Sequence, residues 1–473
     1  MITIVAVEAR VTHVATRIPF RYGIAEMVAA PHVVVQVTLT DGATFTRGWA
    51  SEHLPPKWFT KDPDSLFADE VTDMVAVIEH AVLAAEGLSG ASAFAVWEQL
   101  QAAQDEWSAS EDIPGLLAGL GSAIVERAII DATCRLVGLP FASALRSGAL
   151  GFDAARIHPE LRGQSLDESF PERSDTTIAV RHTVGLSDAL TDNEVDSAPN
   201  DDLPVSLEAV IARYGVTHFK IKTAGRLEDD IPRLNRVLDI IDAAGIEPTL
   251  TIDGNESMKT AEHLVEWTRG LLGDERLARV LRERLVAVEQ PFHRSIALSA
   301  EASEALRLLR DDVAVIIDES DYAVPAVRQA MDLGYAGGTY KGCKGVFRGL
   351  ANAALVRSRG AGSVLTAEDL STIPPLTVPQ DLLVAHVMGL THIERNGHHY
   401  FGRLAPLAPD IEDVALMAHP DVYEMHADGR VRLSIEDGVI QLDTLLSSPF
   451  GLAGELNIAS LEPLSAEAAA RGM

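Results

Sequence analysis

Five short strings decide the fold of this 473-residue chain, because each delivers a charged residue at the end of a predicted strand. They are Phe219-Lys220-Ile221-Lys222, Thr251-Ile252-Asp253-Gly254-Asn255, Val288-Glu289-Gln290-Pro291, Ile317-Asp318-Glu319-Ser320 and Tyr340-Lys341-Gly342. In chain order they read lysine, acid, acid, acid, lysine, at intervals of 31, 36, 29 and 23 residues from Lys222 to Lys341. Such intervals fit strand–helix units of roughly 25–35 residues and predict a (β/α) barrel.

The segments on either side of the barrel carry other patterns. Residues 2–50 alternate like antiparallel strands, whereas residues 64–139 have helical spacing. Residues 151–178 and 188–204 lack periodicity and are interpreted as surface insertions or linkers. The predicted fold class is α/β, a modified TIM barrel with an α+β N-terminal capping domain that the C-terminal segment completes. The predicted divisions are 1–150 capping domain, 151–178 linker or insertion, 179–428 catalytic barrel and 429–473 C-terminal return to the capping domain.

Composition excludes several classes of partner. The chain carries 69 acids against 39 bases, a formal net charge of −30, which disfavours nucleic acid and anionic membrane surfaces. The first residues show no basic stretch followed by an apolar one, and no apolar run reaches the roughly 18 residues of a membrane span. We therefore expect a cytoplasmic protein whose two cysteines, Cys134 and Cys343, are reduced thiols.

The three acids predict a metal site. In a barrel the catalytic groups lie at the C-terminal ends of the strands, and neighbouring strands are about 4.8 Å apart. Asp253, Glu289 and Asp318 therefore converge on a volume that suits a hard dication such as Mg²⁺. Without a cation, three such carboxylates would repel one another and raise their own pKa values.

The two lysines predict acid/base chemistry. Counted from a first strand at 178–186, Lys222 ends strand two and Lys341 ends strand six, which lie on opposite sides of an eight-stranded barrel. This arrangement suits removal of a proton α to a carboxylate by one lysine while the other returns a proton. The enolate needs electrostatic stabilisation, and the base must be neutral, which Lys220 and a nearby dication would favour.

These strings resemble the enolase superfamily, specifically the muconate lactonizing enzyme-like subgroup of the mandelate racemase/muconate lactonizing enzyme family. Residues 123–131 and 448–452 extend the resemblance to the capping helix and the C-terminal return. The resemblance implies a Mg²⁺-dependent isomerase or lyase, with Mn²⁺ as an alternative metal, a small-molecule carboxylate substrate and a homo-oligomer. It also implies that residues 19–29 and 51–59 are loops that select the substrate.

Several assignments stay open at this point. Lys220, Asn255, Glu319 and Glu368 are candidate substrate contacts or hydrogen-bond partners of the site, and Lys344 competes with Lys341. Residues 394–396 read Glu-Arg-Asn, where dipeptide epimerases of this subgroup have Asp-x-Asp. The histidines at 392, 398 and 399 are interpreted as solvated loop residues rather than a metal site. The reaction is racemisation, epimerisation or cycloisomerisation; the alternatives are an acid-sugar dehydratase and a non-enzymatic ligand-binding barrel.

Overall fold

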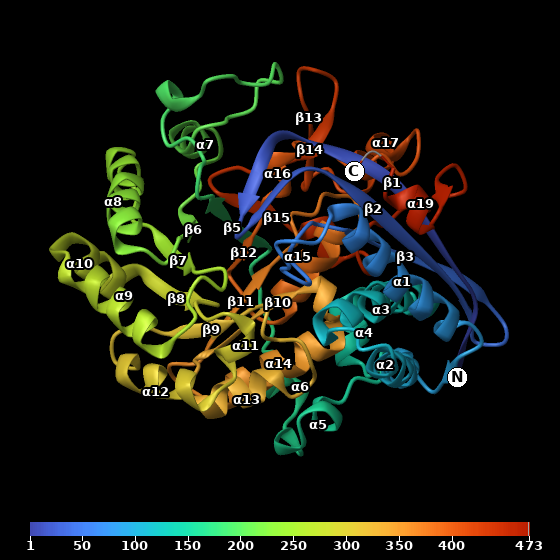
Figure 1. The fold of residues 1–473 in the computed structure, drawn as a ribbon. Helices are drawn as coiled ribbons and strands as arrows, with labels where there is room; N and C mark the ends of the chain where they lie inside the picture. Colours follow the sequence, from blue (N-terminus) through green and yellow to red (C-terminus); the bar gives the residue numbers. More distant parts are fainter. Residues whose placement is uncertain (472) are drawn as a thin grey trace.

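A curled sheet of parallel strands forms the centre of the computed structural model, which describes residues 1–471 and 473 (Figure 1). Its hydrogen-bonded order is β11-β10-β9-β8-β7-β6-β5-β12, so the ladder runs round the barrel with one seam between β11 and β12. The strands are β5 (Thr177–Val184), β6 (His218–Lys222), β7 (Thr249–Asp253), β8 (Leu285–Glu289), β9 (Val315–Ile317), β10 (Gly337–Lys341), β11 (Val364–Glu368) and β12 (His392–Glu394). The predicted barrel is confirmed.

Helices wrap the outside of these strands, as Figure 1 shows for α8 to α14. Because helices cover the outer face and side chains fill the inner one, the strands are buried on both sides, as is usual for a parallel sheet. The helices are α7 (Leu207–Tyr214), α8 (Leu227–Ala243), α9 (Ala261–Gly273), α10 (Glu275–Arg284), α11 (Arg294–Ala297), α12 (Ala300–Leu309), α13 (Ala326–Leu333), α14 (Val346–Ser358), α15 (Thr377–Val387) and α16 (Gly397–Tyr400).

The N-terminal part is a separate antiparallel sheet packed on helices, and it confirms the predicted α+β capping domain. The sheet has the order β16-β1-β2-β3, and β4 also pairs with β1. Gly48 on β3 permits close packing, because an added Cβ would lie 2.1 Å from the Ala132 nitrogen of α3. The elements are β1 (Ile2–Tyr22), β2 (Ala25–Thr40), β3 (Phe45–His53), β4 (Ser89–Gly90), α1 (Phe67–Ala85), α2 (Ala93–Ser110), α3 (Gly115–Val137) and α4 (Phe141–Arg146).

The C-terminal segment contributes to both domains. β15 (Val439–Gln441) pairs antiparallel with β5 of the barrel and buries Ile440 there. Phe450 packs on Phe141 of α4 with ring centroids 4.6 Å apart, and β16 (Glu462–Pro463), which pairs with β1, and α19 (Ala466–Ala469) also lie against the capping domain. Between them lie α17 (Ile411–Ala418), β13 (Tyr423–Met425), β14 (Val431–Leu433) and α18 (Asp443–Leu446). The domain boundaries stay predictions.

The two aperiodic stretches are tied to the rest of the molecule. In the first, α5 (Ala154–Ile157) and α6 (Leu166–Ser169) pack against α14. In the second, Arg17 of β1 donates to both carboxylate oxygens of Asp201, at 2.6 and 2.9 Å, so the insertion is fixed to the capping hairpin. Among the described residues, no helix has both the length and the apolar character needed to cross a membrane.

Candidate active site

Strand register brings the predicted charged residues to one end of the barrel. Lys222 of β6 lies opposite Asp253 of β7, which in turn lies opposite Glu289 of β8. Lys341 of β10 lies opposite Glu368 of β11. Three strands separate β6 from β10 in each direction round the sheet order, so Lys222 and Lys341 approach from opposite sides.

The ammonium group of Lys220 occupies the centre of this constellation. Its Nζ lies 2.6 Å from a carboxylate oxygen of Glu368, 2.9 Å from those of Asp253 and Glu289, and 3.2 Å from that of Glu394. Burial lowers the pKa of Lys220, but the surrounding carboxylates outweigh burial and raise this pKa well above its ordinary value. Lys220 is therefore a fixed positive charge beneath the cavity.

The predicted catalytic lysines each hold one close carboxylate partner. Lys222 Nζ lies 2.6 Å from Asp253 Oδ2, and Lys341 Nζ lies 2.7 Å from Asp318 Oδ2. Both lysines line the main cavity, whereas Lys344 does not. Instead, Lys344 Nζ donates to the backbone oxygen and to Oδ1 of Asp318, both at 2.7 Å, and so fixes that carboxylate from behind. The position at the cavity favours Lys341 over Lys344 as the acid/base residue.

The carboxylates form an oxygen-rich group that fits a hard dication, but its membership differs from the prediction. Ligand oxygens of Glu289, Asp318 and Glu368 lie within 4.8 Å of one another, all buried. Asp253 is not in this group; Lys220 and Lys222 engage its Oδ2, and its Oδ1 accepts the Asn255 backbone N–H at 2.8 Å. Buried Glu289 Oε2 has no hydrogen-bond partner. A cation of the Mg²⁺ type would satisfy that orphaned oxygen.

The electrostatics of these acids agree with a cation site. Burial first, and then the neighbouring Glu368, raise the pKa of Glu289 well above its ordinary value. Burial acts in the same direction on Asp253, but Lys220 and Lys222 outweigh it and hold the pKa of Asp253 below its ordinary value. Of the three clustered carboxylates, Glu289 is the one whose pKa is raised, whereas burial of Asp318 and Glu368 is outweighed by nearby cations, which lower their pKa values.

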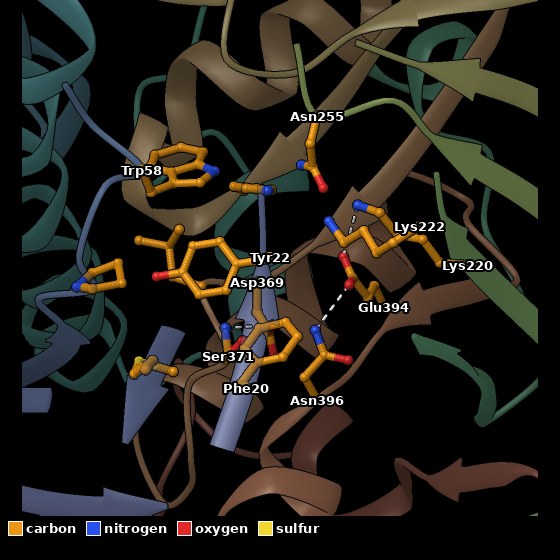
Figure 2. A pocket seen from close by; sticks show the side chains of 14 residues that line it. Phe20, Tyr22, Trp58, Lys220, Lys222, Asn255, Asp369, Ser371, Glu394 and Asn396 are labelled. Carbon is orange, nitrogen blue, oxygen red and sulfur yellow. Dashed lines mark hydrogen bonds and ion pairs between the residues drawn. The ribbon is translucent and has the colours of Figure 1, made fainter. Parts of the chain in front are cut away.

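A cavity of about 420 Å³, its open mouth included, lies over the lysines (Figure 2). Its floor contains Lys220, Lys222 and Lys341. Capping-domain residues contribute an apolar cover in which Trp58 packs over Lys341, with Nζ 4.8 Å from the ring centroid. The remaining lining residues are Phe20, Tyr22, Met27, Pro55, Asn255, Asp369, Leu370, Ser371, Glu394 and Asn396.

Of the four predicted substrate contacts, two line this cavity and two do not. Lys220 and Asn255 are in the lining. Glu368 is buried below it, where it pairs with Lys220 and with Arg181 at 2.8 Å. Glu319 is buried beside Asp318, and burial, Asp318 and Glu256 raise the pKa of Glu319 to about 7. The structure gives Glu319 and Glu368 no direct contact with the cavity.

The cover lies in the two segments predicted to select the substrate, residues 19–29 and 51–59, but the sequence did not single out Phe20, Met27 or Trp58. These residues belong to the capping domain, where apolar residues resemble ordinary core. Glu394 and Asn396 carried a usable signal, because Glu394 ends the eighth strand just as the other charged residues end theirs. Figure 2 shows both side chains at the cavity, joined by a hydrogen bond of 2.8 Å from Asn396 Nδ2 to Glu394 Oε1.

Of the three histidines in the last barrel unit, His398 and His399 are buried and His392 is half-buried, so the prediction of solvated loop residues is wrong. His392 begins β12 and its Nδ1 lies 2.7 Å from Arg181 Nη1, below the cavity. His398 and His399 lie in α16 and pack around His182, with ring centroids 5.6 and 5.0 Å away. They are not among the described residues whose ligand atoms cluster tightly enough to hold a metal. Packing against β1 and β5 explains their burial.

Comparisons with known proteins agree with this architecture. Residues 202–402 match the family model described as "Enolase C-terminal domain-like". A mandelate racemase/muconate lactonizing protein from Herpetosiphon aurantiacus is 18% identical with a TM-score of 0.61, over 96% of this chain and 99% of that one. A dipeptide epimerase from Enterococcus faecalis V583, complexed with Mg and L-Leu-L-Tyr, is 15% identical with a TM-score of 0.60, over 96% and 100%. A comparison with curated proteins gave no match.

A muconate lactonizing enzyme from Pseudomonas fluorescens, complexed with muconolactone, is also similar, at 14% identity and a TM-score of 0.59 over 96% of each chain. The fold and the family match define an enolase-type barrel with a capping domain. Residues 202–402 match the enolase family model, and the whole chain shares its fold with mandelate racemase/muconate lactonizing proteins. Membership of the muconate lactonizing enzyme-like subgroup stays a prediction.

Proposed function

We propose that the protein removes the α-proton of a small carboxylate substrate and, after the enolate forms, completes a racemisation, epimerisation or cycloisomerisation. One observation carries the proposal: Lys222 and Lys341 reach the same cavity from opposite strands, above a buried group of carboxylates. Glu289 and Asp318, together with Asp253 or Glu368, would hold the dication. When bound, Mg²⁺ would supply electrostatic stabilisation of the negative charge that develops on the substrate carboxylate.

The side chains divide the chemistry by position. Lys222 or Lys341, once neutral, accepts the α-proton, and the lysine on the other side returns a proton to the same carbon from the opposite face. This sequence inverts the stereocentre. Lys220, held charged by its carboxylates, adds positive potential at the floor. Trp58 and Tyr22 cover the cavity and exclude water, which strengthens these interactions.

The cavity also supports a substrate class. An apolar cover made of Phe20, Tyr22, Met27 and Trp58 suits a carboxylate that carries an apolar group away from the reacting carbon. Similar folds include proteins described as a dipeptide epimerase, an N-succinyl Arg/Lys racemase and a muconate lactonizing enzyme, which supports the general reaction type. An acid-sugar dehydratase would be favoured by a histidine at the cavity end of strand seven or eight. His392 begins β12, the eighth strand, and no histidine is in the described cavity lining.

Hydrogen exchange at the α-carbon tests the proposal. The protein is incubated in D₂O with Mg²⁺ and a library of N-acyl amino acids, dipeptides, lactones and acid sugars, and α-deuterium is measured by NMR. We expect incorporation into at least one carboxylate, its loss with EDTA, and its loss in Lys222→Met and Lys341→Met. Lys259→Met is the matched control, because Lys259 is exposed and does not line this cavity.

An absence of exchange with every compound would contradict the proposal and favour a ligand-binding barrel without catalysis.

Two accompanying predictions need their own measurements. Parallel titrations with Mg²⁺ and Mn²⁺ compare the two metals, and light scattering after size-exclusion chromatography determines whether the protein is a homo-oligomer.

A further inference from the structure

A capping-domain segment at residues 54–65, here called the lid loop, crosses the mouth of the cavity. Pro55 and Trp58 of the lid loop line the cavity, and the Trp58 ring lies over Lys341. Figure 2 shows the Trp58 indole at the edge of the cavity, across from Lys220 and Lys222. The position of this one loop therefore decides whether the floor is covered or open.

Arg294, at the start of α11, binds the lid loop through its backbone. Its Nη1 donates to the Phe59 carbonyl oxygen at 2.6 Å, and its Nη2 donates to that of Trp58 at 3.0 Å. The same guanidinium holds both carboxylate oxygens of Glu256 through one edge, Nε to Oε1 at 2.8 Å and Nη2 to Oε2 at 2.9 Å. A planar guanidinium can make these four bonds at once, which a lysine cannot.

Lys61 closes the cluster from the lid-loop side. Its Nζ lies 3.0 Å from Glu256 Oε2 and also donates to the Asn255 carbonyl oxygen. The Glu256 side chain is fully buried, so its charge depends on these two cations. Glu256 directly follows Asn255, a cavity residue at the end of the third barrel strand, so the cluster joins the lid loop to the site itself.

The backbone on both sides of the cluster is held in a left-handed conformation. Lys61 has φ 55°, Asn255 has φ 42° and Glu256 has φ 62°. Such conformations in residues other than glycine are unfavourable by about 1 kcal/mol or more and persist where side-chain interactions impose them. Removal of the interactions would let both segments relax.

We propose that Glu256, Arg294 and Lys61 form a latch that keeps the lid loop closed. They act as positioning residues for the proton-transfer reaction, and this role rests on the function proposed above. The far end of the lid loop is anchored within the capping domain, where Lys57 pairs with Glu70 at 3.1 Å and Lys57 Nζ donates to Ser65 Oγ at 2.7 Å. The latch is thus the attachment of the lid loop to the barrel, and its release exposes Lys341 without unfolding either domain.

Acrylamide quenching of Trp58 fluorescence tests the latch without reference to activity. The signal of Trp58 is taken as the difference between each protein and its Trp58→Phe counterpart. In the parent protein Trp58 is 6% exposed, so quenching is weak. We expect stronger quenching in Arg294→Ala and Glu256→Gln, and an intermediate value in Arg294→Lys, which keeps the ion pair but not both carbonyl bonds. Arg226→Ala is the matched control, since Arg226 pairs with Asp229 nearby and does not contact the lid loop.

Steady-state kinetics with a substrate found by the exchange experiment provide the second readout. If the closed state falls to about one tenth of the population, KM rises about tenfold while kcat changes much less. Unchanged Trp58 quenching in Arg294→Ala and Glu256→Gln would overturn the latch. If Arg294→Ala does not fold, Lys61→Met decides in the same way. Increased quenching in a protein that shows no exchange activity would uphold the latch while contradicting the proposed function.

Discussion

Replacement of Lys220 by methionine should destabilise the protein and make it dependent on a divalent cation. Lys220 Nζ contacts four buried carboxylates at 2.6 to 3.2 Å, and its loss leaves them without their shared counter-charge. Removal of one partner from a buried ion pair typically destabilises by about 3–5 kcal/mol. Unfolding entropy of roughly 2.1 cal/mol/K per residue gives about 1 kcal/mol/K for this chain, so Tm should fall by about 4 °C.

Addition of Mg²⁺ should then recover much of that loss, because the cation takes over the charge that Lys220 supplied. A ligand at a hundred times its Kd stabilises the folded state by about 2.7 kcal/mol. Differential scanning calorimetry of the parent protein, Lys220→Met and the control Lys259→Met, each with and without Mg²⁺, measures the effect; Lys259 is exposed. The electrostatic reasoning fails if Lys220→Met melts with the parent protein, or if Mg²⁺ raises the Tm of Lys259→Met as much as that of Lys220→Met.

Three further predictions address the metal, the pH dependence and the domain packing. Glu289→Gln should weaken Mg²⁺ binding, measured by isothermal titration calorimetry, by more than about tenfold, whereas Glu319→Gln should change it little. Burial lowers the pKa of His182 from 6.5 to about 4, so the buried neutral imidazole stabilises the folded state fully above pH 6.5, and this stabilisation is lost as pH falls toward 4. Glutamine does not titrate, so His182→Gln should recover about 2 kcal/mol of unfolding free energy at pH 5, measured by urea denaturation. Gly48→Ala should destabilise the protein by about 3 kcal/mol in the same assay, because the added Cβ would lie 2.1 Å from the Ala132 nitrogen. Gly119→Ala on α3 is the control: its added Cβ meets no atom within 4 Å, so the change should be neutral or stabilising.

The floor of the site could be predicted from the sequence because each part of its signal is local. Strand β7 runs through apolar and threonine residues and ends at Asp253, and β8 ends at Glu289 in the same manner. A charge at the end of a buried strand is visible in the sequence, and the spacing of such charges defines the barrel units. The sequence could not indicate that Glu368 joins Glu289 and Asp318, because this depends on how side chains from nonadjacent strands share one space.

The cover of the site could not be predicted residue by residue, because its residues serve the capping domain and the cavity together. Phe20 stacks on Tyr400 with ring centroids 4.0 Å apart, a contact between β1 and α16 that the sequence separates by hundreds of residues. The contacts of the insertion at 188–204 could not be predicted from the sequence either. Asp201 has the sequence context of a loop acid, yet it accepts a hydrogen bond from Arg17 of the capping hairpin. Such long-range partners lack any periodic signature.

The two lysines of β6 illustrate how partners, rather than residue type, divide the work of the site. An ammonium group has three N–H donors, and Lys220 directs all three to Glu289, Glu368 and Glu394. Lys220 therefore has no donor left for a substrate even though it lines the cavity. Lys222, two residues later on the same face of the strand, donates to Asp253 and to no other described side chain. Its remaining N–H groups are available at the cavity, so Lys222 can exchange a proton with a ligand while Lys220 fixes the charge beneath it.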